Sequence, residues 1–336
     1  MISKDYAVDI NAAARLLRDG KLVAFPTETV YGLGADASNP AAVRRIFNFK
    51  GRPANHPLIV HLADTEHLED WACDIPSMAW RLAERFWPGP LTLILPKAAK
   101  VPPVVTGGQN TIGLRVPAHP LALELLKTFG GGVAAPSANR FGRISPTCAD
   151  HVREEFEEQV ELVLDGGDCL VGLESTIISL IDKRPILLRP GGISASEIAE
   201  VLGTHLEHPA SAPSAIRTPG LLLSHYAPFT PLEVQPAEAL WARAKTLRDA
   251  GKQAAIMAFS ACSPGEFSPQ DPHTVIMPSE PVSYAKKLYT TMRTLDRGCF
   301  NTLLVETPPN TEAWSAIINR LHRAAFPNKK PRRNIR

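Results

Sequence analysis

The chain has 336 residues, of which 44% are hydrophobic and 21% charged, and its formal net charge is +2. This composition is typical of a folded globular protein, and the length favours two domains over one very large core. The small net charge does not favour a strongly basic nucleic-acid-binding protein, and no apolar run is long enough to span a membrane.

Five cysteines are scattered along the chain without a Cys-x-x-Cys pair: Cys73, Cys148, Cys169, Cys262 and Cys299. An odd, dispersed set indicates reduced thiols, and it favours neither a disulfide framework nor a zinc site. The N-terminal residues do not form a signal-peptide pattern. We therefore expect a cytoplasmic protein that has no metal site of its own.

Helix and strand patterns alternate over residues 1–203, which we expect to form the catalytic domain. Asn39 and Pro40 are the cap and first residue of a helix that ends at Gly51. Other apolar patterns predict helices at 10–18, 78–86 and 121–129, and strands at 22–25, 58–61, 91–95, 112–116, 132–135, 162–164, 176–181 and 186–188. The α/β alternation predicts a large twisted mixed sheet with flanking helices.

Residues 204–231 break this alternation with Pro, Ser, Ala and Thr, and they predict a stiff linker or lid. Residues 232–327 alternate again and predict a smaller doubly wound, Rossmann-like α/β domain. No Gly-x-Gly-x-x-Gly or Walker loop occurs in it, so nothing there indicates a nucleotide. Residues 328–336 form a basic tail.

Three segments carry the clearest chemical signal. Lys50 and Arg52 are one residue apart where a helix ends, and two such cations suit a polyphosphate. Ser137 and Asn139 follow a Gly/Ala-rich strand end, where a hydroxyl and an amide could bond phosphate or sugar oxygens. The third segment is Pro26-Thr27-Glu28-Thr29-Val30-Tyr31-Gly32-Leu33-Gly34. Taken singly, the cations also fit a helix-dipole complement, and Ser-Ala-Asn also fits an ordinary turn.

In this order, the three segments resemble the L-threonylcarbamoyladenylate synthases, the YrdC-like family, and the resemblance covers essentially the whole chain. Five further segments carry it: Gly113-Leu114-Arg115-Val116-Pro117, Glu174-Ser175-Thr176, Leu188-Arg189-Pro190-Gly191-Gly192, Pro219-Gly220 and His225-Tyr226-Ala227-Pro228. The last of these, with about a hundred residues beyond it, is similar to the long two-domain form of the family.

The resemblance implies that L-threonine, bicarbonate and ATP are combined into threonylcarbamoyl-AMP and diphosphate. This is the first step of N6-threonylcarbamoyladenosine formation in tRNAs that read codons beginning with A. The product passes to the tRNA threonylcarbamoyltransferase, whereas direct tRNA binding is left open and no membrane partner is expected. Mg²⁺ is expected with ATP, held mostly by phosphate oxygens and water. Positioning and charge neutralisation suffice for such a reaction.

The resemblance also implies the site residues. Lys50 and Arg52 would be catalytic and clamp the phosphates. The ATP-binding set would be Lys50, Arg52, His56, Thr111, Ser137, Asn139, Ser145, Arg189 and Tyr226, with His56 at a position where the family more often has Asn. The threonine-binding set would be Thr29, His61, Arg115, Ala135 and Ser175.

Single residues of these sets also fit simpler roles. Thr29 and Ser175 fit ordinary turn or strand hydroxyls, and His61 fits a satisfied core histidine. Arg115 is different, because a charge within an apolar strand is costly unless it is paired or lines a cavity.

Two other functions are open. An RNA-binding module should show interleaved aromatics and a strongly basic domain, and the 7% aromatic content and small charge argue against it. A carbamoyl-transfer enzyme of the hydrogenase-maturation type should carry zinc-finger-like cysteine pairs and extra domains, which this sequence lacks.

Overall fold

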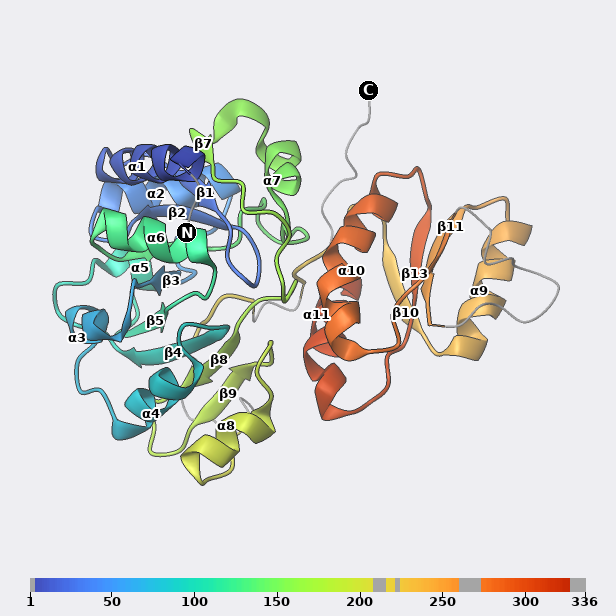
Figure 1. Ribbon diagram of the computed structural model, residues 1–336. Helices are drawn as coiled ribbons and strands as arrows, with labels where there is room; N and C mark the ends of the chain where they lie inside the picture. The colour runs from blue at the N-terminus through green and yellow to red at the C-terminus, as the bar shows by residue number, and fades with distance from the viewer. Residues whose placement is uncertain (1–3, 208–215, 221–223, 260–272, 327–336) are drawn as a thin grey trace. The chain divides into compact units, whose positions relative to one another are not determined.

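The computed structural model describes residues 4–207, 216–220, 224–259 and 273–326 (Figure 1). The chain divides into two compact units. Unit 1 comprises Met1–Phe141 and Ser145–Leu221, and unit 2 comprises Gly142–Ile144 and Leu222–Arg336. The predicted linker or lid at 204–231 lies partly outside the described residues, and the predicted tail at 328–336 lies wholly outside them.

Unit 1 is built on a mixed sheet with nine strands in the described part of the chain. In spatial order they are β7 (Leu162–Val163), β1 (Val23–Phe25), β2 (Gly32–Asp36), β6 (Val133–Ala134), β3 (Ile59–His61), β5 (Thr111–Arg115), β4 (Leu91–Pro96), β8 (Thr176–Ser179) and β9 (Ile186–Arg189). The pairs β1–β7, β3–β5 and β4–β8 are parallel and the others antiparallel. The predicted mixed α/β sheet is confirmed.

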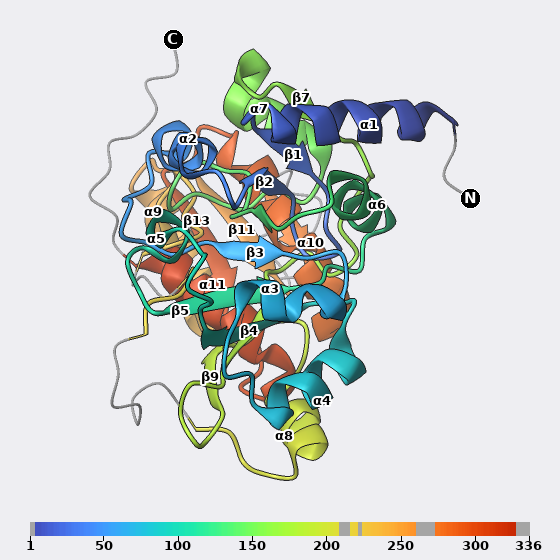
Figure 2. The same cartoon turned by 90° about the vertical axis from the view of Figure 1, so that its left-hand side faces the viewer.

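Helices pack on this sheet through two apolar cores. They are α1 (Lys4–Arg18), α2 (Pro40–Lys50), α3 (Leu68–Trp71), α4 (Ser77–Phe86), α5 (Pro103–Thr106), α6 (Pro120–Phe129), α7 (Ala149–Phe156) and α8 (Ala195–Leu202), with 3-10 turns at Thr65–His67 and Glu157–Gln159. In one core, Leu17 of α1 and Leu125 of α6 pack with Phe25 of β1, and the two helices lie side by side (Figure 2). The larger core includes Ile46 of α2 and Leu82 of α4.

Helix α2 begins and ends as the sequence predicts, and its end places the predicted phosphate cations. The Asn39 side chain accepts hydrogen bonds from the N–H groups of Ala41 and Ala42, at 3.0 and 3.2 Å. Gly51 closes the helix with φ 61°. This left-handed conformation favours glycine because it strains residues with a Cβ. Lys50 therefore ends the helix, and Arg52 follows immediately after the cap.

Strand β2 is an element that the sequence does not predict. Two of its five residues are glycines, which weaken a strand signal. The packing explains Gly34, because a Cβ there would lie 2.8 Å from the Phe25 ring and 2.9 Å from Val133. Both glycines belong to the motif segment 26–34. A close approach within the sheet is therefore one reason for its composition.

Unit 2 contains a four-stranded parallel sheet within its described residues. Its strand order is β10 (Leu232–Gln235), β13 (Thr302–Glu306), β11 (Ala254–Ala258) and β12 (Thr274–Ile276). Helix α9 (Ala237–Asp249) covers one face, and α10 (Pro281–Asp296) and α11 (Ser315–Ala325) cover the other (Figure 1). Helices on both faces of a parallel sheet make the predicted doubly wound fold.

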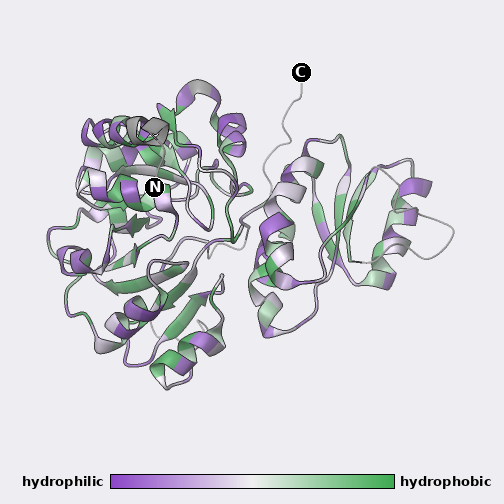
Figure 3. Cartoon of the chain, viewed as in Figure 1, coloured by the Kyte–Doolittle hydropathy of each residue, from purple (hydrophilic) through white to green (hydrophobic). Residues whose placement is uncertain are grey.

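Hydropathy follows these layers within each unit. Strands are largely hydrophobic, whereas many helix positions are hydrophilic (Figure 3). Among the described helices, none combines the length and the apolarity that crossing a membrane requires.

Candidate active site

The structure brings three predicted threonine-binding residues together at one end of the unit 1 sheet. His61 ends β3 and Arg115 ends β5, and they are neighbours in the parallel register. Thr29 lies in the loop between β1 and β2, and its hydroxyl accepts a hydrogen bond of 2.9 Å from Nη1 of Arg115. Ala135 directly follows β6, and its N–H donates to the carbonyl of Ile59 in β3.

Arg115 is buried, and its charge is paired as its apolar surroundings require. Its Nη2 donates to Oε1 of Glu28 at 2.6 Å, and its Nε donates to the carbonyl of Gly89 at 3.1 Å. With the bond to Thr29, three of the five guanidinium N–H groups have partners among the described residues. The two others can bind a substrate carboxylate in a fixed orientation.

Glu28 is a site residue that the sequence reasoning misses. It is 5% exposed, and its Oε2 accepts a hydrogen bond of 2.9 Å from the N–H of Ala118. The available signal is a carboxylate inside the motif segment 26–34, where every residue is buried. A buried carboxylate needs a cation, and Arg115 is the cation that the same resemblance singles out.

His61 is a neutral imidazole with one nitrogen still to be satisfied. Burial and then the charge of Arg115 lower the pKa of His61 to about 3. Its Nδ1 is buried and has no hydrogen-bond partner among the described residues. Leaving a buried polar atom unpaired costs free energy. This observation favours a ligand contact over a satisfied core histidine.

Ser175 and Arg189 come from the two predicted substrate sets and are joined directly. Nε of Arg189 donates to the carbonyl of Ser175 at 3.0 Å, and Nη2 donates to its hydroxyl oxygen at 3.1 Å. The same hydroxyl lies 2.8 Å from Oγ1 of Thr92 in β4. Nη1 of Arg189 donates to the carbonyl of Pro219. A predicted phosphate cation therefore lies beside a predicted threonine contact.

Lys50 forms the centre of the predicted phosphate site. Its Nζ donates to the carbonyls of Ser137, at 2.5 Å, and Asn139. The side chain is buried, and within the described residues it forms no ion pair. Burial, followed by the nearby Arg52 charge, holds the pKa of Lys50 well below its usual range. Helix α2 and the Ser-Ala-Asn segment are thus tied together at this ammonium.

Arg52 and His56 meet on an aromatic ring that the sequence reasoning does not select. The Arg52 guanidinium lies 5.5 Å from the centroid of the Phe141 ring, and the His56 ring meets the same ring edge-on at 5.3 Å. Nη2 of Arg52 donates to the carbonyl of Pro57 at 2.9 Å. Burial, and next the Arg52 charge, lower the pKa of His56. The only sequence signal for Phe141 is its place two residues after Asn139.

The remaining predicted ATP residues are more dispersed. Ser145 is fully buried and donates to Oε1 of Glu174 at 2.5 Å. Thr111 begins β5 and Arg115 ends it, so they lie at opposite ends of that strand. Tyr226 belongs to unit 2, where its ring stacks on Tyr289 with centroids 5.9 Å apart. The predicted contact of Tyr226 with ATP would join the two units, and it stays a prediction.

Acidic and other metal-ligating side chains do not cluster in the described residues into a group that could hold a metal ion. Mg²⁺ bound with ATP, through phosphate oxygens and water, stays a prediction.

Comparison with known proteins covers both units. The Sua5–YciO–YrdC family, described as telomere recombination, matches residues 15–191. The family described as the C-terminal domain of threonylcarbamoyl-AMP synthase matches residues 193–326. The threonylcarbamoyl-AMP synthase of Pyrococcus abyssi is 42% identical over 325 residues, which cover 94% of each chain. That of Bacillus subtilis is 40% identical over 321 residues, 94% of this chain and 92% of the relative.

A crystal structure of P. abyssi Sua5 complexed with L-threonine has the same fold throughout. It superposes with a TM-score of 0.86 at 41% identity and covers 94% of both chains. The near-complete coverage at this identity and the two family matches together identify the family of the chain. The chain belongs to the Sua5–YciO–YrdC family, in the two-domain form of the threonylcarbamoyl-AMP synthases.

Proposed function

We propose that this protein is a threonylcarbamoyl-AMP synthase, a nucleotidyltransferase that converts L-threonine, bicarbonate and ATP into threonylcarbamoyl-AMP and diphosphate. The names of the P. abyssi and B. subtilis relatives and the threonine bound to P. abyssi Sua5 support this activity. The product would serve N6-threonylcarbamoyladenosine formation in tRNAs that read codons beginning with A. It would pass to the tRNA threonylcarbamoyltransferase in the cytoplasm.

The burial of Lys50 beside Arg52 is the observation that carries this proposal. Within the described residues, the Lys50 ammonium is bonded only to neutral carbonyl oxygens, and the Arg52 charge lowers the pKa of Lys50 more than the Glu155 charge raises it. A buried ammonium that is not bonded to a carboxylate is costly. A triphosphate would supply several negative charges at this place and offset that cost. A single amino-acid carboxylate is better suited to the fork of Arg115.

The threonine half-site follows from Arg115 and its neighbours. Two N–H groups of the Arg115 guanidinium have no hydrogen-bond acceptor among the described residues, and they would bind the carboxylate of threonine. The hydroxyls of Thr29 and Ser175 and the neutral ring of His61 would read the ammonium and hydroxyl of threonine. The backbone at Ala135 would close this side.

The ATP half-site would use the cations in different ways. Lys50 acts as a point charge, Arg52 as a planar fork on the Phe141 ring, and Arg189 as the cation next to Ser175. Hydroxyl and amide groups would bond phosphate or ribose oxygens; they belong to Thr111, Ser137, Asn139 and Ser145. His56 would add a contact from the edge of the Phe141 ring.

The Ser175–Arg189 contact would place the threonine half-site directly beside the ATP half-site. The threonine nitrogen must bond to the bicarbonate carbon, with loss of water, and an oxygen on that carbon must attack the α-phosphorus in line, with diphosphate as the leaving group. Both steps require the reacting groups to be close and oriented, and such positioning lowers a barrier substantially. Charge on the departing diphosphate would be neutralised by the surrounding cations.

The purified protein tests this proposal when it is incubated with MgATP, L-threonine and bicarbonate. We expect diphosphate release that requires all three substrates, together with a nucleotide product of the mass of threonylcarbamoyl-AMP. Lys50→Met should abolish release. The matched variant Lys100→Met, at a 65% exposed side chain paired with Asp70, should behave as wild type. Diphosphate release that does not require threonine would contradict the proposal.

A further inference from the structure

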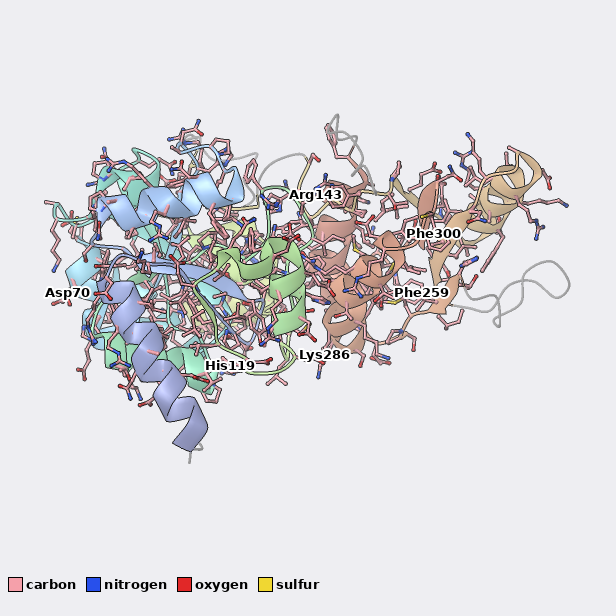
Figure 4. All side chains as sticks on the ribbon, turned by 90° about the horizontal axis from the view of Figure 1, so that it is seen from above. Asp70, His119, Arg143, Phe259, Lys286 and Phe300 are labelled. Atoms are coloured by element: carbon pink, nitrogen blue, oxygen red, sulfur yellow. The ribbon has the colours of Figure 1, made fainter. Side chains whose placement is uncertain are left out.

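Between Phe141 and Ser145, the chain leaves unit 1 for three residues. Gly142–Ile144, which we call the strap, belongs to unit 2, whereas Phe141 before it and Ser145 after it belong to unit 1. Arg143 is the central residue of the strap (Figure 4). The strap therefore links both units through the covalent chain.

Hydrogen bonds to its carbonyl groups fix both ends of the strap within unit 2. The N–H of Ala227 donates to the carbonyl of Gly142 at 2.9 Å. At the other end, the Arg293 guanidinium of α10 donates to the carbonyl of Ile144. Gly142 has φ 82°, a conformation that favours glycine. The strap thus has a defined course and is not a loose loop.

Arg143 adds the side-chain contacts. It forms a parallel bridge with Ala227, and its Nη1 donates to the carbonyl of Pro228 at 3.1 Å. Its guanidinium carbon lies 3.5 Å from the centroid of the Phe229 ring, which is a close cation–π contact. The partners of Arg143 thus directly follow the motif pair His225-Tyr226 in the chain.

Of the residues on either side of the strap, Phe141 contacts predicted ATP residues and Ser145 is one of them. The N–H of Phe141 donates to the carbonyl of Lys50 at 2.9 Å, and its ring contacts Arg52 and His56. Ser145 is itself a predicted ATP contact. Three residues span at most about 10 Å, so the strap has little slack. A shift of the strap must therefore move Phe141 or Ser145.

We propose that Arg143 is a positioning residue for ATP, which acts by fixing the strap on unit 2. Through Phe141, the fixed strap holds Lys50, Arg52 and His56 in the arrangement that binds the triphosphate. This inference rests on the proposed function and gives unit 2 a role in it. Unit 2 would thereby influence ATP affinity through the covalent chain.

The test is Arg143→Ala in the full-length protein, with kinetics and amide hydrogen exchange as separate readouts. We expect the KM for ATP to rise on the order of tenfold, the size of a lost close cation–π contact. The KM for L-threonine should change less than about twofold, because the Arg115 site does not include the strap. Exchange over residues 137–147 should become faster. Arg143→Lys should recover part of the affinity, since an ammonium can also lie over the ring.

Arg243→Ala is the matched control. It makes the same change in unit 2 and removes an ion pair with Glu233, at 2.9 Å, that does not involve the strap. Its KM for ATP and its exchange over 137–147 should equal those of wild type. Phe229→Leu provides a second variant, and combined with Arg143→Ala its effect should be less than additive.

Two outcomes separate this inference from the proposed function. Unchanged exchange and an unchanged KM for ATP in folded Arg143→Ala and Phe229→Leu would overturn the role of the strap. A wild-type protein that makes no threonylcarbamoyl-AMP would overturn the proposed function. In that case the exchange measurement would still decide whether Arg143 positions residues 137–147.

Discussion

Glu28 and Arg115 form an ion pair inside unit 1, with Oε1 of Glu28 2.6 Å from Nη2 of Arg115 and side-chain exposures of 7% and 4%. The second oxygen of Glu28 binds the N–H of Ala118, so the pair ties the β1–β2 loop to the segment after β5. The guanidinium is therefore oriented by the protein alone. Such preorganisation reduces the entropic cost of binding a substrate carboxylate.

Removing Glu28 should damage both stability and threonine binding. Breaking a buried pair leaves an uncompensated charge, so Glu28→Ala should lower the free energy of unfolding by about 3–5 kcal/mol. Asp150→Ala breaks the exposed pair with Arg153 and should cost less than about 1 kcal/mol. Urea unfolding measures the free energy of unfolding of the two variants. Equal losses in the two variants would show that the Glu28–Arg115 pair is no more important than a surface pair.

ATP binding should take up a proton at Lys50. Burial and Arg52 lower the pKa of this ammonium in the free protein, whereas bound phosphates favour the charged form and raise it. At a pH between the Lys50 pKa of the free protein and that of the ATP complex, the complex holds more protons than the separate protein and ATP. ATP affinity therefore falls as pH rises through this range. Calorimetry from about pH 7.5 to 9.5, above phosphate ionisation, in buffers of different ionisation enthalpy measures the uptake. Proton uptake should be lost in Lys50→Met and retained in Lys100→Met. Unchanged uptake in Lys50→Met would show that another group takes up the proton.

Arg52→Ala should abolish diphosphate release in a protein that still folds. A lost charge-assisted phosphate contact costs on the order of 1.5–3 kcal/mol in binding, and more where the contact strengthens in the transition state. Circular dichroism checks the fold. Arg52→Lys keeps the charge but loses the planar fork, and its activity should lie between those of the wild type and Arg52→Ala. Wild-type turnover in Arg52→Ala would exclude a phosphate clamp at this residue.

The amino-acid site should discriminate weakly against serine and strongly against valine. A missing methyl group is worth about 1–3 kcal/mol, whereas valine would leave the groups that read the hydroxyl unpaired. These groups are Thr29, His61 and Ser175, and the unsatisfied Nδ1 of His61 makes it the one most affected. Diphosphate release with each amino acid measures the preference. Equal rates with valine and serine would mean that no group in the site reads a hydroxyl.

Local chemistry explains which parts of the fold are predictable from the sequence. The ends of α2 follow from an Asn cap and a left-handed glycine, and both are visible in the sequence. Strand β2 is not, because the need for Gly34 arises from Phe25 and Val133 packed across neighbouring strands. Helix α7 is short, and five of its eight residues are charged or histidine, so its apolar period is weak.

The site shows the same division between local and tertiary information. The ordered segments are sufficient to select Lys50, Arg115 and their neighbours as candidates. The partner of Arg115 lies 87 residues away in the chain, and only the sheet register and the β1–β2 loop bring it within bonding distance. Phe141 likewise cannot be selected from the sequence, because its candidate role depends on Arg52 and His56, which contact its ring only in the folded protein.

The strap also has a consequence for synthesis on the ribosome. The Arg293 side chain, which donates to the Ile144 carbonyl, is made 149 residues after Ile144, so a nascent chain that has completed the unit 1 sheet still lacks this anchor of the strap. At usual elongation rates, the synthesis of these 149 residues lasts about 7–30 s. During this time the Ile144 carbonyl lacks its anchor, although the strap partners Ala227, Pro228 and Phe229 are made before Arg293. Complete anchoring of the strap therefore becomes possible only after translation has passed α10.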